Sequence, residues 1–178
     1  MSAVILVTGA PGVGKTSMIK QLVGLELAKF GGFYTEEVRQ QGQRLGFEVV
    51  TIDGRRGLLA QKSEAAPTKS RVGKYAVNVD VMDQLAVPAM IAAGENGLIV
   101  VVDEIGPMEM FSASFRLAVK NIVDDQRVTL IGSIVERSCE FSDEVKQHPR
   151  AMLIRLTREN REYWARMIPL LLVRSANH

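Results

Sequence analysis

The stretch Gly9–Thr16, which reads GAPGVGKT, constrains the fold more than any other part of the sequence. An apolar run, Ala3–Thr8, precedes it, and apolar residues recur at helical spacing from Lys15 onward. The stretch is therefore a glycine-rich turn between a buried strand and a helix. Its spacing, G-x-x-x-x-G-K-S/T, lets successive backbone N–H groups and a helix N-terminus surround one phosphate. The sequence predicts a phosphate site at this first strand–helix turn.

The residues of this turn have separate predicted roles. Lys15 reaches the β and γ phosphates of a bound nucleotide and acts in catalysis, and the Thr16 hydroxyl binds Mg²⁺. The other predicted nucleotide contacts are Gly9, Ala10, Pro11, Gly12, Val13, Gly14 and Ser17. Because glycine makes up about 7% of residues in proteins, a chance turn is a poor explanation of the whole pattern in this setting. A nucleotide is the expected ligand.

A second apolar run, Leu98–Val102, continues directly into Asp103 and Glu104. Carboxylates buried at a strand end are costly unless a cation meets them. We expect this strand to lie parallel to Ala3–Thr8 and to end beside it, so that Asp103 holds Mg²⁺, usually through water. Glu104 would then face the γ-phosphate and deprotonate the attacking water as general base. The alternative for Glu104 is a solvated loop carboxylate or a helix cap.

The same stretch leaves the preferred base open. Asp103–Gly106 reads DEIG and also fits the D-x-x-G of GTPases, in which the glycine N–H contacts the γ-phosphate. Gly106 is therefore a further candidate for the nucleotide site. The N-K-x-D motif that reads guanine is absent, since the nearest string, Asn78–Val81, has no lysine. A dedicated GTPase is disfavoured.

An arginine that stabilises negative charge in the transition state is a further expectation for such a site. The candidates are Arg39, Arg44, Arg137 and Arg155. Arg137 follows the predicted strand 128–134, whose carboxyl end should lie at the edge where open α/β sheets bind ligands. We predict Arg137 as the catalytic arginine. We expect Glu36 or Glu37 to be a cross-strand partner of Arg44 or to face water.

The rest of the chain alternates between strand and helix patterns. A β-hairpin is predicted over 32–53, a third strand after the turn 53–57, a loop over 62–71 and a strand over 74–79. Further strands are predicted over 98–102, 128–134 and 151–156, and helices over 15–29, 80–93, 112–123 and 142–148, with a final helix capped by Thr157. Gly31 and Gly32 should stop the first helix, and Asp80 should cap the second. The alternation implies an α/β fold with a mostly parallel sheet flanked by helices and an added antiparallel β-hairpin, in a single domain over 1–178.

Composition and charge argue against several classes of protein. With 178 residues, 47% of them hydrophobic and 24% charged, the chain matches a globular protein with one core. The net charge of +2, without a dense run of Lys or Arg, makes a nucleic-acid partner a poor fit. The apolar runs are shorter than the roughly 20 residues that span a membrane, and Cys139 has no second cysteine for a disulfide. We expect a cytoplasmic protein that binds nucleoside triphosphates, with no protein partner indicated.

Several motifs of the chain resemble, in the same order, the small nucleoside-triphosphatase family of P-loop NTPases. They are GAPGVGKT, GGFYTEEVR, RLGFEVVTID, YAVNVD, VVDEIGPMEMFS and LTRENR. This family includes thermophilic prokaryotic enzymes and the human cancer-related nucleoside triphosphatase. The resemblance spans nearly the whole chain, and it implies a RecA-like sheet and Mg²⁺-dependent hydrolysis of ATP, GTP, CTP and UTP to the diphosphate and phosphate.

The resemblance also carries over the family's functional positions. They fall on Gly9, Gly12, Gly14, Lys15, Thr16, Asp103 and Glu104. Pro107 stands where some members have a lysine after the DEIG, so the charge of that lysine cannot be transferred to this chain.

Two other functions stay open. A small nucleoside or nucleotide kinase would share the phosphate loop, but it needs an arginine-rich lid and an acceptor pocket. The turn 54–57, GRRG, is a poor candidate for such a lid. A nucleotide-dependent switch or assembly module, in which hydrolysis times an interaction, is compatible with every motif above. Release of phosphate without any acceptor distinguishes the hydrolase from the kinase.

Overall fold

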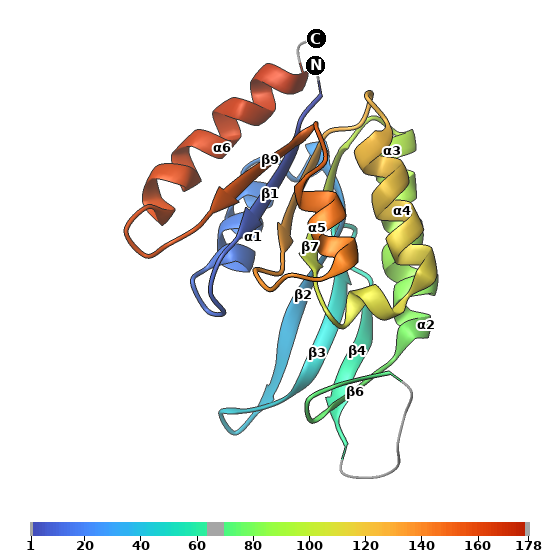
Figure 1. The fold of residues 1–178 in the computed structure, drawn as a ribbon. Helices are drawn as coiled ribbons and strands as arrows, with labels where there is room; N and C mark the ends of the chain where they lie inside the picture. Colours follow the sequence, from blue (N-terminus) through green and yellow to red (C-terminus); the bar gives the residue numbers. More distant parts are fainter. Residues whose placement is uncertain (1, 64–69, 177–178) are drawn as a thin grey trace.

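A mixed sheet of nine strands runs through the centre of the computed structural model, which describes residues 2–63 and 70–176 (Figure 1). The strand order is β5-β6-β4-β3-β2-β7-β8-β1-β9. The strands are β1 Val4–Thr8, β2 Phe30–Gln40, β3 Gln43–Thr51, β4 Arg56–Lys62, β5 Arg71–Val72, β6 Tyr75–Val77, β7 Ile99–Ile105, β8 Leu130–Ile134 and β9 Ala151–Arg155. In the half of the sheet formed by β2, β7, β8, β1 and β9, neighbouring strands are parallel. In the other half, formed by β2, β3, β4, β6 and β5, neighbouring strands are antiparallel. The predicted α/β class is confirmed, and the antiparallel part extends beyond a single hairpin.

The order of the parallel strands differs from the prediction at one point. The strand that carries Asp103, β7, does not lie beside β1, because β8 lies between them. Both β1 and β8 are five residues long and buried throughout, so their patterns do not indicate which of them neighbours β7. Gly132 of β8 lets the two backbones approach, since a Cβ there would lie 2.4 Å from the carbonyl oxygen of Val102. β8 therefore takes the position that we predicted for β1.

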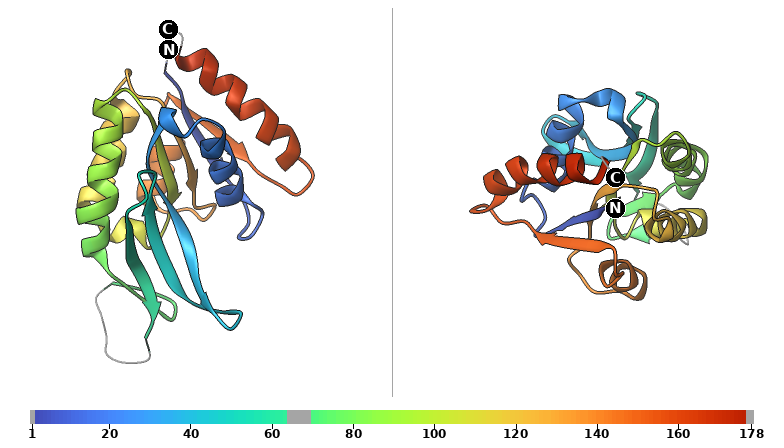
Figure 2. Two further views of the ribbon diagram at one scale, coloured as in Figure 1. Left: turned by 180° about the vertical axis from the view of Figure 1, so that it is seen from behind. Right: turned by 90° about the horizontal axis from the view of Figure 1, so that it is seen from above.

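Helices cover both faces of the sheet (Figures 1 and 2). They are α1 Lys15–Leu25, α2 Val79–Val81, α3 Val87–Glu95, α4 Ala113–Asp124, α5 Glu140–Lys146 and α6 Arg161–Ala176, with a π-helical turn at Met82–Ala86 and 3₁₀ turns at Leu27–Lys29 and Glu109–Phe111. α3 and α4 pack on one face, and α1 and α6 pack on the other. Alternate residues of β1 point to opposite faces of the sheet. Val4 and Leu6 pack on the side of α3 and α4, whereas Ile5 and Val7 pack on the side of α1 and α6.

Gly31 and Gly32 do not stop the first helix as predicted. α1 ends at Leu25, a 3₁₀ turn follows, and both glycines lie inside β2. A Cβ on Gly31 would lie 2.6 Å from the Cβ of Ala93 in α3, and a Cβ on Gly32 would lie 2.3 Å from the carbonyl oxygen of Val101 in β7. The glycines thus permit close packing of β2 against its neighbours, a long-range contact that a local pattern does not show.

The helix boundaries agree with the prediction in part. Ser112 caps α4, because its hydroxyl accepts a hydrogen bond from the N–H of Phe115 at 2.9 Å. Asp80 is not the cap that we predicted: the helix begins one residue earlier, at Val79, with Asn78 in the N-cap position. α5 begins and ends two residues before its predicted bounds. Ordinary end effects of one or two residues account for these shifts.

Two further predictions concern loops. The loop predicted over 62–71 falls largely on residues 64–69, which lie outside the described part of the chain, and its last residue, Arg71, begins β5. Thr157 and Asn160 exchange hydrogen bonds in the turn before α6: the Thr157 N–H donates to Oδ1 of Asn160, and the Asn160 N–H donates to Oγ1 of Thr157. Thr157 thus caps the turn before the final helix, whereas α6 itself begins only at Arg161 and not directly after Thr157 as predicted.

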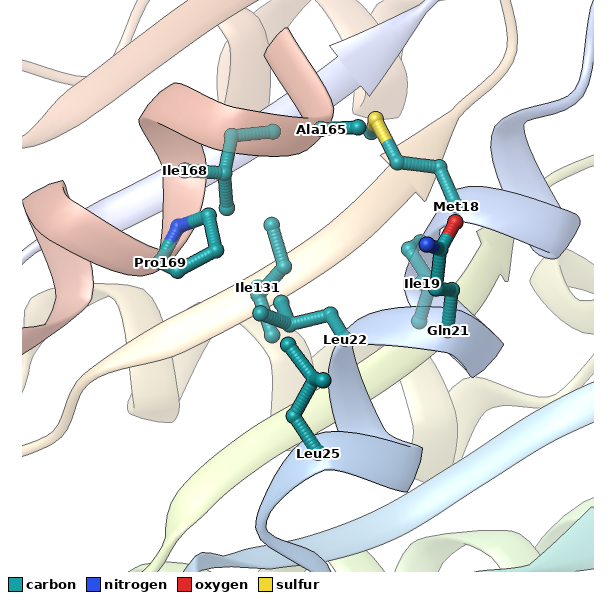
Figure 3. Close-up of a pocket in the computed structure, with 9 residues that line it drawn as sticks. All are labelled: Met18, Ile19, Gln21, Leu22, Leu25, Ile131, Ala165, Ile168 and Pro169. Carbon is teal, nitrogen blue, oxygen red and sulfur yellow. The ribbon is translucent and has the colours of Figure 1, made fainter. Parts of the chain in front are cut away.

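The interface between α1 and α6 contains a small apolar slot (Figure 3). Ile131 of β8 lies between Leu22 of α1 and the pair Ile168 and Pro169 of α6. The slot has a volume of about 30 Å³, which is the space of a water molecule, so this layer is packed. A ligand as large as a nucleotide has to bind elsewhere.

Candidate active site

The predicted phosphate loop, Gly9–Thr16, connects β1 to α1. Gly9, Gly12 and Gly14 have positive φ angles, and Gly14, with φ 107°, directly precedes the first residue of α1. A side chain at Gly9 would also lie 2.5 Å from the carbonyl oxygen of Leu156. The backbone therefore needs glycine to turn over the N-terminus of α1, where unpaired N–H groups and the helix dipole attract an anion.

Lys15 places its ammonium group over this loop. Nζ donates to the carbonyl oxygen of Gly9 at 2.9 Å and contacts that of Ala10 at 3.5 Å. Its charge also acts on the carboxyl groups of Asp103 and Glu104. The charge of Lys15 thus favours the ionised form of both carboxyl groups, and its ammonium group lies where a phosphate bound by the loop would reach it.

Asp103 is fully buried at the carboxyl end of β7. Burial raises the pKa of its carboxyl group, and the hydroxyls of Ser133 and Thr16 together with the charge of Lys15 offset this in part. Ser133, on the interposed strand β8, donates a hydrogen bond to Oδ1. Oδ2 of Asp103 has no hydrogen-bond partner among the described residues, although the Thr16 hydroxyl is nearby. This oxygen is therefore free to bind another group.

A hydrated Mg²⁺ ion fits this set of oxygens. Oγ1 of Thr8, at the end of β1, is a second buried oxygen without a partner in the described part of the chain. Mg²⁺ in nucleotide sites is held by one or two protein oxygens, by phosphates and by water. The described residues contain no group of three His, Cys, Asp or Glu side chains that could hold a metal alone. Thr16 and Asp103 therefore fit a metal that arrives with its phosphates.

Glu104 follows Asp103 inside β7, which continues to Ile105 instead of ending at Val102 as predicted. The peptide bond between the two acids is cis, and the register of β7 on β8 shifts between Val102 and Ile105. Burial raises the pKa of Glu104, Lys15 lowers it in part, and Asp103 raises it further. A half-buried carboxylate with a raised proton affinity suits a general base near neutral pH.

Two pockets open beside the phosphate loop. A large one of about 780 Å³ lies between the loop, α1 and the β2–β3 hairpin, and it is lined by Pro11, Gly12, Gly14, Lys15, Thr16, Ser17, Lys20, Thr35, Glu36, Glu37, Arg44, Phe47 and Glu104. A smaller one of about 280 Å³ is lined by Ala10, Pro11, Gly12, Val13, Glu136, Arg155, Leu156, Thr157, Arg158 and Glu159. Pro11 and Gly12 line both, so the loop separates the two pockets. Of the predicted site residues, Gly9, Asp103, Gly106 and Arg137 line neither.

The arginines are distributed differently from the prediction. Arg137 lies in the loop after β8 with its side chain exposed, and its backbone carbonyl accepts hydrogen bonds from Lys146 and Ser142. Arg44 of β3 lines the large pocket, where it pairs with Glu37, as we expected for a cross-strand partner. Arg44 thus lines the same pocket as the phosphate loop, and the role of Arg137 stays a prediction.

Gly106 is buried beneath the site. A Cβ on this residue would lie 2.9 Å from Oε2 of Glu109, another buried carboxyl group. Burial raises the pKa of Glu109 to about 8, and the backbone amide of Gly106 is one of the groups that lower it in part. The Gly106 N–H therefore lies near the carboxyl group of Glu109, and Gly106 does not line the pocket that contains Lys15 and Glu104. Its predicted contact with the γ-phosphate stays a prediction.

Two residues of the site were not predicted from the sequence. Ser133 is near the carboxyl end of a fully buried strand, and that position is a signal that could have indicated it. Glu109 stands between Met108 and Met110, and such apolar neighbours could have indicated its burial. Neither signal shows which side chain the residue contacts.

A strand that leads through a glycine turn into a helix, together with a second parallel strand that carries an acidic pair near its carboxyl end, is the framework of the P-loop nucleotide-binding proteins. The helix start and the buried carboxylate described above have the positions that this class requires. The family model described as NTPase matches residues 4–169 of the chain. The chain therefore belongs to the NTPase family.

Relatives are similar over most of their length. Nucleoside-triphosphatase THEP1 of Thermotoga petrophila is 41% identical over 158 residues, which cover 89% of this chain and 86% of the relative. The cancer-related nucleoside-triphosphatase of Homo sapiens is 35% identical over 176 residues, with coverages of 92% and 93%. The crystal structure of THEP1 from Aquifex aeolicus has a TM-score of 0.87 at 36% identity and covers 95% of this chain and 98% of its own. The predicted family and fold class are confirmed.

One finding concerns membranes. Across residues 2–63 and 70–176, each helix is too short or too polar to cross a bilayer.

Proposed function

We propose that this chain hydrolyses nucleoside triphosphates to nucleoside diphosphate and phosphate, that it requires Mg²⁺, and that it accepts ATP, GTP, CTP and UTP with little preference. One observation carries the proposal: Lys15, Thr16 and Glu104 line the same pocket of about 780 Å³. A phosphate chain bound by the loop would therefore lie next to a carboxylate that can take a proton from water. Membership of the NTPase family supports the same activity.

The phosphates would be bound by the loop backbone and by Lys15. Backbone N–H groups at the start of α1 donate to phosphate oxygens, and the ammonium group of Lys15 exchanges its contact with the Gly9 carbonyl for the phosphates. Thr16 and Asp103 would hold Mg²⁺, which supplies positive charge to the β and γ phosphate oxygens. Ser133 fixes the orientation of Asp103 through Oδ1, so that Oδ2 is available.

Glu104 would orient the attacking water and accept its proton. The water oxygen forms a bond to the γ-phosphorus while the bond from that phosphorus to the bridging oxygen breaks, and the diphosphate leaves with the electron pair. Burial raises the pKa of Glu104, which makes it a stronger base than an exposed glutamate. A general base of this kind contributes roughly 10²–10⁴ to the rate.

In this proposal the phosphates lie in the pocket with Lys15 and Glu104, and the base occupies the smaller pocket on the other side of the loop. The lining of the smaller pocket supports weak discrimination between bases. Its charged side chains, among them Arg155, Arg158 and Glu159, are exposed, and Arg155 is paired with Glu136 at 2.7 Å. A site rejects a wrong base strongly when that base would leave buried polar groups unpaired. Exposed groups hydrogen-bond to water instead, so a change of base costs little.

Phosphate release from each of the four triphosphates tests the proposal. The assay is run with Mg²⁺ and with EDTA, without any acceptor. Release from all four with Mg²⁺ alone is expected. A thousandfold preference for one base, about 4 kcal/mol, contradicts the broad specificity, and equal release in EDTA contradicts the metal requirement. Formation of diphosphate and a nucleoside monophosphate only after a nucleoside is added, without free phosphate, identifies a kinase, and tight binding without turnover identifies a switch module.

A further inference from the structure

Glu109 is a buried carboxyl group that the proposed hydrolysis does not use. It begins the 3₁₀ turn Glu109–Phe111 after β7 and is only 5% exposed. Backbone hydrogen bonds close this turn: the Met110 N–H donates to the carbonyl oxygen of Gly106 at 3.0 Å, and the Ser112 N–H donates to that of Glu109 at 3.1 Å. The turn therefore brings the side chain of Glu109 back toward the end of β7.

The side chains of Glu109 and Glu104 lie beside each other at Gly106. A Cβ added to Gly106 would lie 2.9 Å from Oε2 of Glu109 and 3.3 Å from Cγ and Cδ of Glu104. Both side chains are thus within contact distance of one point, which glycine leaves empty. The two side chains are therefore neighbours at Gly106.

The surroundings of Glu109 keep its carboxyl group mostly neutral at pH 7. Burial raises its pKa to about 8, backbone amides of Glu109 itself and of Gly106 lower it in part, and the charges of Glu104 and Asp103 raise it. The ion pairs found among the described residues do not include Glu109. A neutral carboxyl group can donate a hydrogen bond to a neighbouring carboxylate.

Glu104 needs such a neighbour if it is to act on water. Lys15 lines the same pocket and attracts the carboxylate of Glu104. A carboxylate that closed onto this ammonium group would leave the water without a base and would also take Lys15 from the phosphates. A second contact, at Gly106, opposes that movement.

We propose that Glu109 is a positioning residue for Glu104: its carboxyl group, packed beside that of Glu104 at Gly106, holds the base in the orientation in which it faces the triphosphate pocket. The inference rests on the proposed role of Glu104 in hydrolysis. Glu109 is 5% exposed and lines neither pocket, and the proposal gives it a contact with Glu104 and none with the nucleotide. Its loss should therefore lower kcat and leave nucleotide affinity unchanged.

Three substitutions separate positioning from packing. Glu109→Gln keeps the length and a hydrogen-bond donor, and kcat should stay within about threefold of the wild type. Glu109→Met keeps the length without a donor, and it should lower kcat by about 10- to 100-fold, the effect of a misplacement near 1 Å. Glu109→Asp withdraws the carboxyl group by one methylene and should also lower kcat. Nucleotide affinity by calorimetry should be unchanged in all three, and thermal melting reports whether each variant is folded.

A double-mutant cycle with Glu104→Gln provides the decisive comparison. If Glu109 acts through Glu104, then Glu109→Met lowers kcat no further in the Glu104→Gln background. Three results would overturn the inference. They are an equal loss of kcat in both backgrounds, wild-type kcat in a folded Glu109→Met variant, and a kcat of Glu109→Gln as low as that of Glu109→Met. If Glu109→Met does not fold, Glu109→Asp takes its place in the cycle. Wild-type turnover by Glu104→Gln refutes the base and the inference together, whereas a wild-type protein that releases no phosphate refutes the proposed function first.

Discussion

Glu109→Gln tests the burial of this carboxyl group through stability alone, without substrate. Glutamate ionises near pH 4.5 in an ordinary environment, and burial raises the pKa of Glu109 to about 8. Between these two values the folded protein keeps a proton that the unfolded chain releases. Each pH unit in this window therefore lowers the free energy of unfolding by up to about 1.4 kcal/mol.

The sign and the window follow from the raised pKa. The stability that the neutral Glu109 contributes is fully present below pH 4.5, declines as the pH rises, and is lost once the pH passes about 8. The Gln variant cannot ionise, so it lacks this decline. Between pH 5 and pH 8 the wild type should lose about 3 kcal/mol relative to Glu109→Gln, an upper value because the folded protein can relax around the charge.

Urea unfolding followed by circular dichroism measures this difference, at pH 5, 6, 7 and 8 and without nucleotide or metal. Titrating groups that do not interact with Glu109 contribute equally to both proteins and cancel in the difference. Glu104 and Asp103 act electrostatically on Glu109, so their response is part of the measured effect. Glu95→Gln is the matched control, since Glu95 at the end of α3 is exposed in the folded protein. The Glu95→Gln difference measured at each pH is the baseline for the Glu109→Gln difference. A Glu109→Gln difference that changes by less than about 1 kcal/mol over the same range would mean that the carboxyl group is ionised in the folded protein.

Three further predictions concern the phosphate site. Lys15→Ala should weaken triphosphate binding and abolish hydrolysis in a folded protein, since alanine is well tolerated at a helix start; wild-type turnover would contradict the role of the loop. Glu104→Gln should keep nucleotide affinity and lower the rate of single-turnover hydrolysis by roughly 10²–10⁴. If the rate of this variant stays within about threefold of the wild type, Glu104 is not the base. Asp103→Asn should raise the Mg²⁺ concentration needed for half-maximal turnover. Arg44→Met should lower turnover more than Arg137→Met, because only Arg44 lines the large pocket; the opposite order would support the arginine that the sequence predicted.

The phosphate loop could be predicted residue by residue because its pattern is local. The φ angles of Gly9 and Gly14 and the helix that starts at Lys15 all arise within a few residues of one another. The same is true of the start of α4, which we predicted at Ser112 and which the structure has at Ala113. Local chemistry determines these features, and the sequence shows it directly.

The parts that were missed depend on contacts between distant segments. The position of β8 depends on how closely Gly132 lets it approach Val102, and the place of Gly32 depends on Val101. Ser133 reaches Asp103 only because β8 lies between β1 and β7. An apolar run predicts a buried strand, but it does not predict the neighbours of that strand, and so it could not identify these side chains as members of the site.

The continuity of β2 has a consequence for the pace of turnover. This strand pairs with β7 as far as Asp103 and with β3 along the hairpin, and its residues Thr35, Glu36 and Glu37 line the large pocket. One wall of the pocket is thus an extension of the sheet, and paired backbone hydrogen bonds hold it in place. Such a wall is not a hinged lid that has to open before the diphosphate can leave. For the proposed hydrolysis we therefore expect the first turnover after mixing to be as fast as later ones; an initial burst of phosphate in a rapid-quench experiment would contradict this expectation.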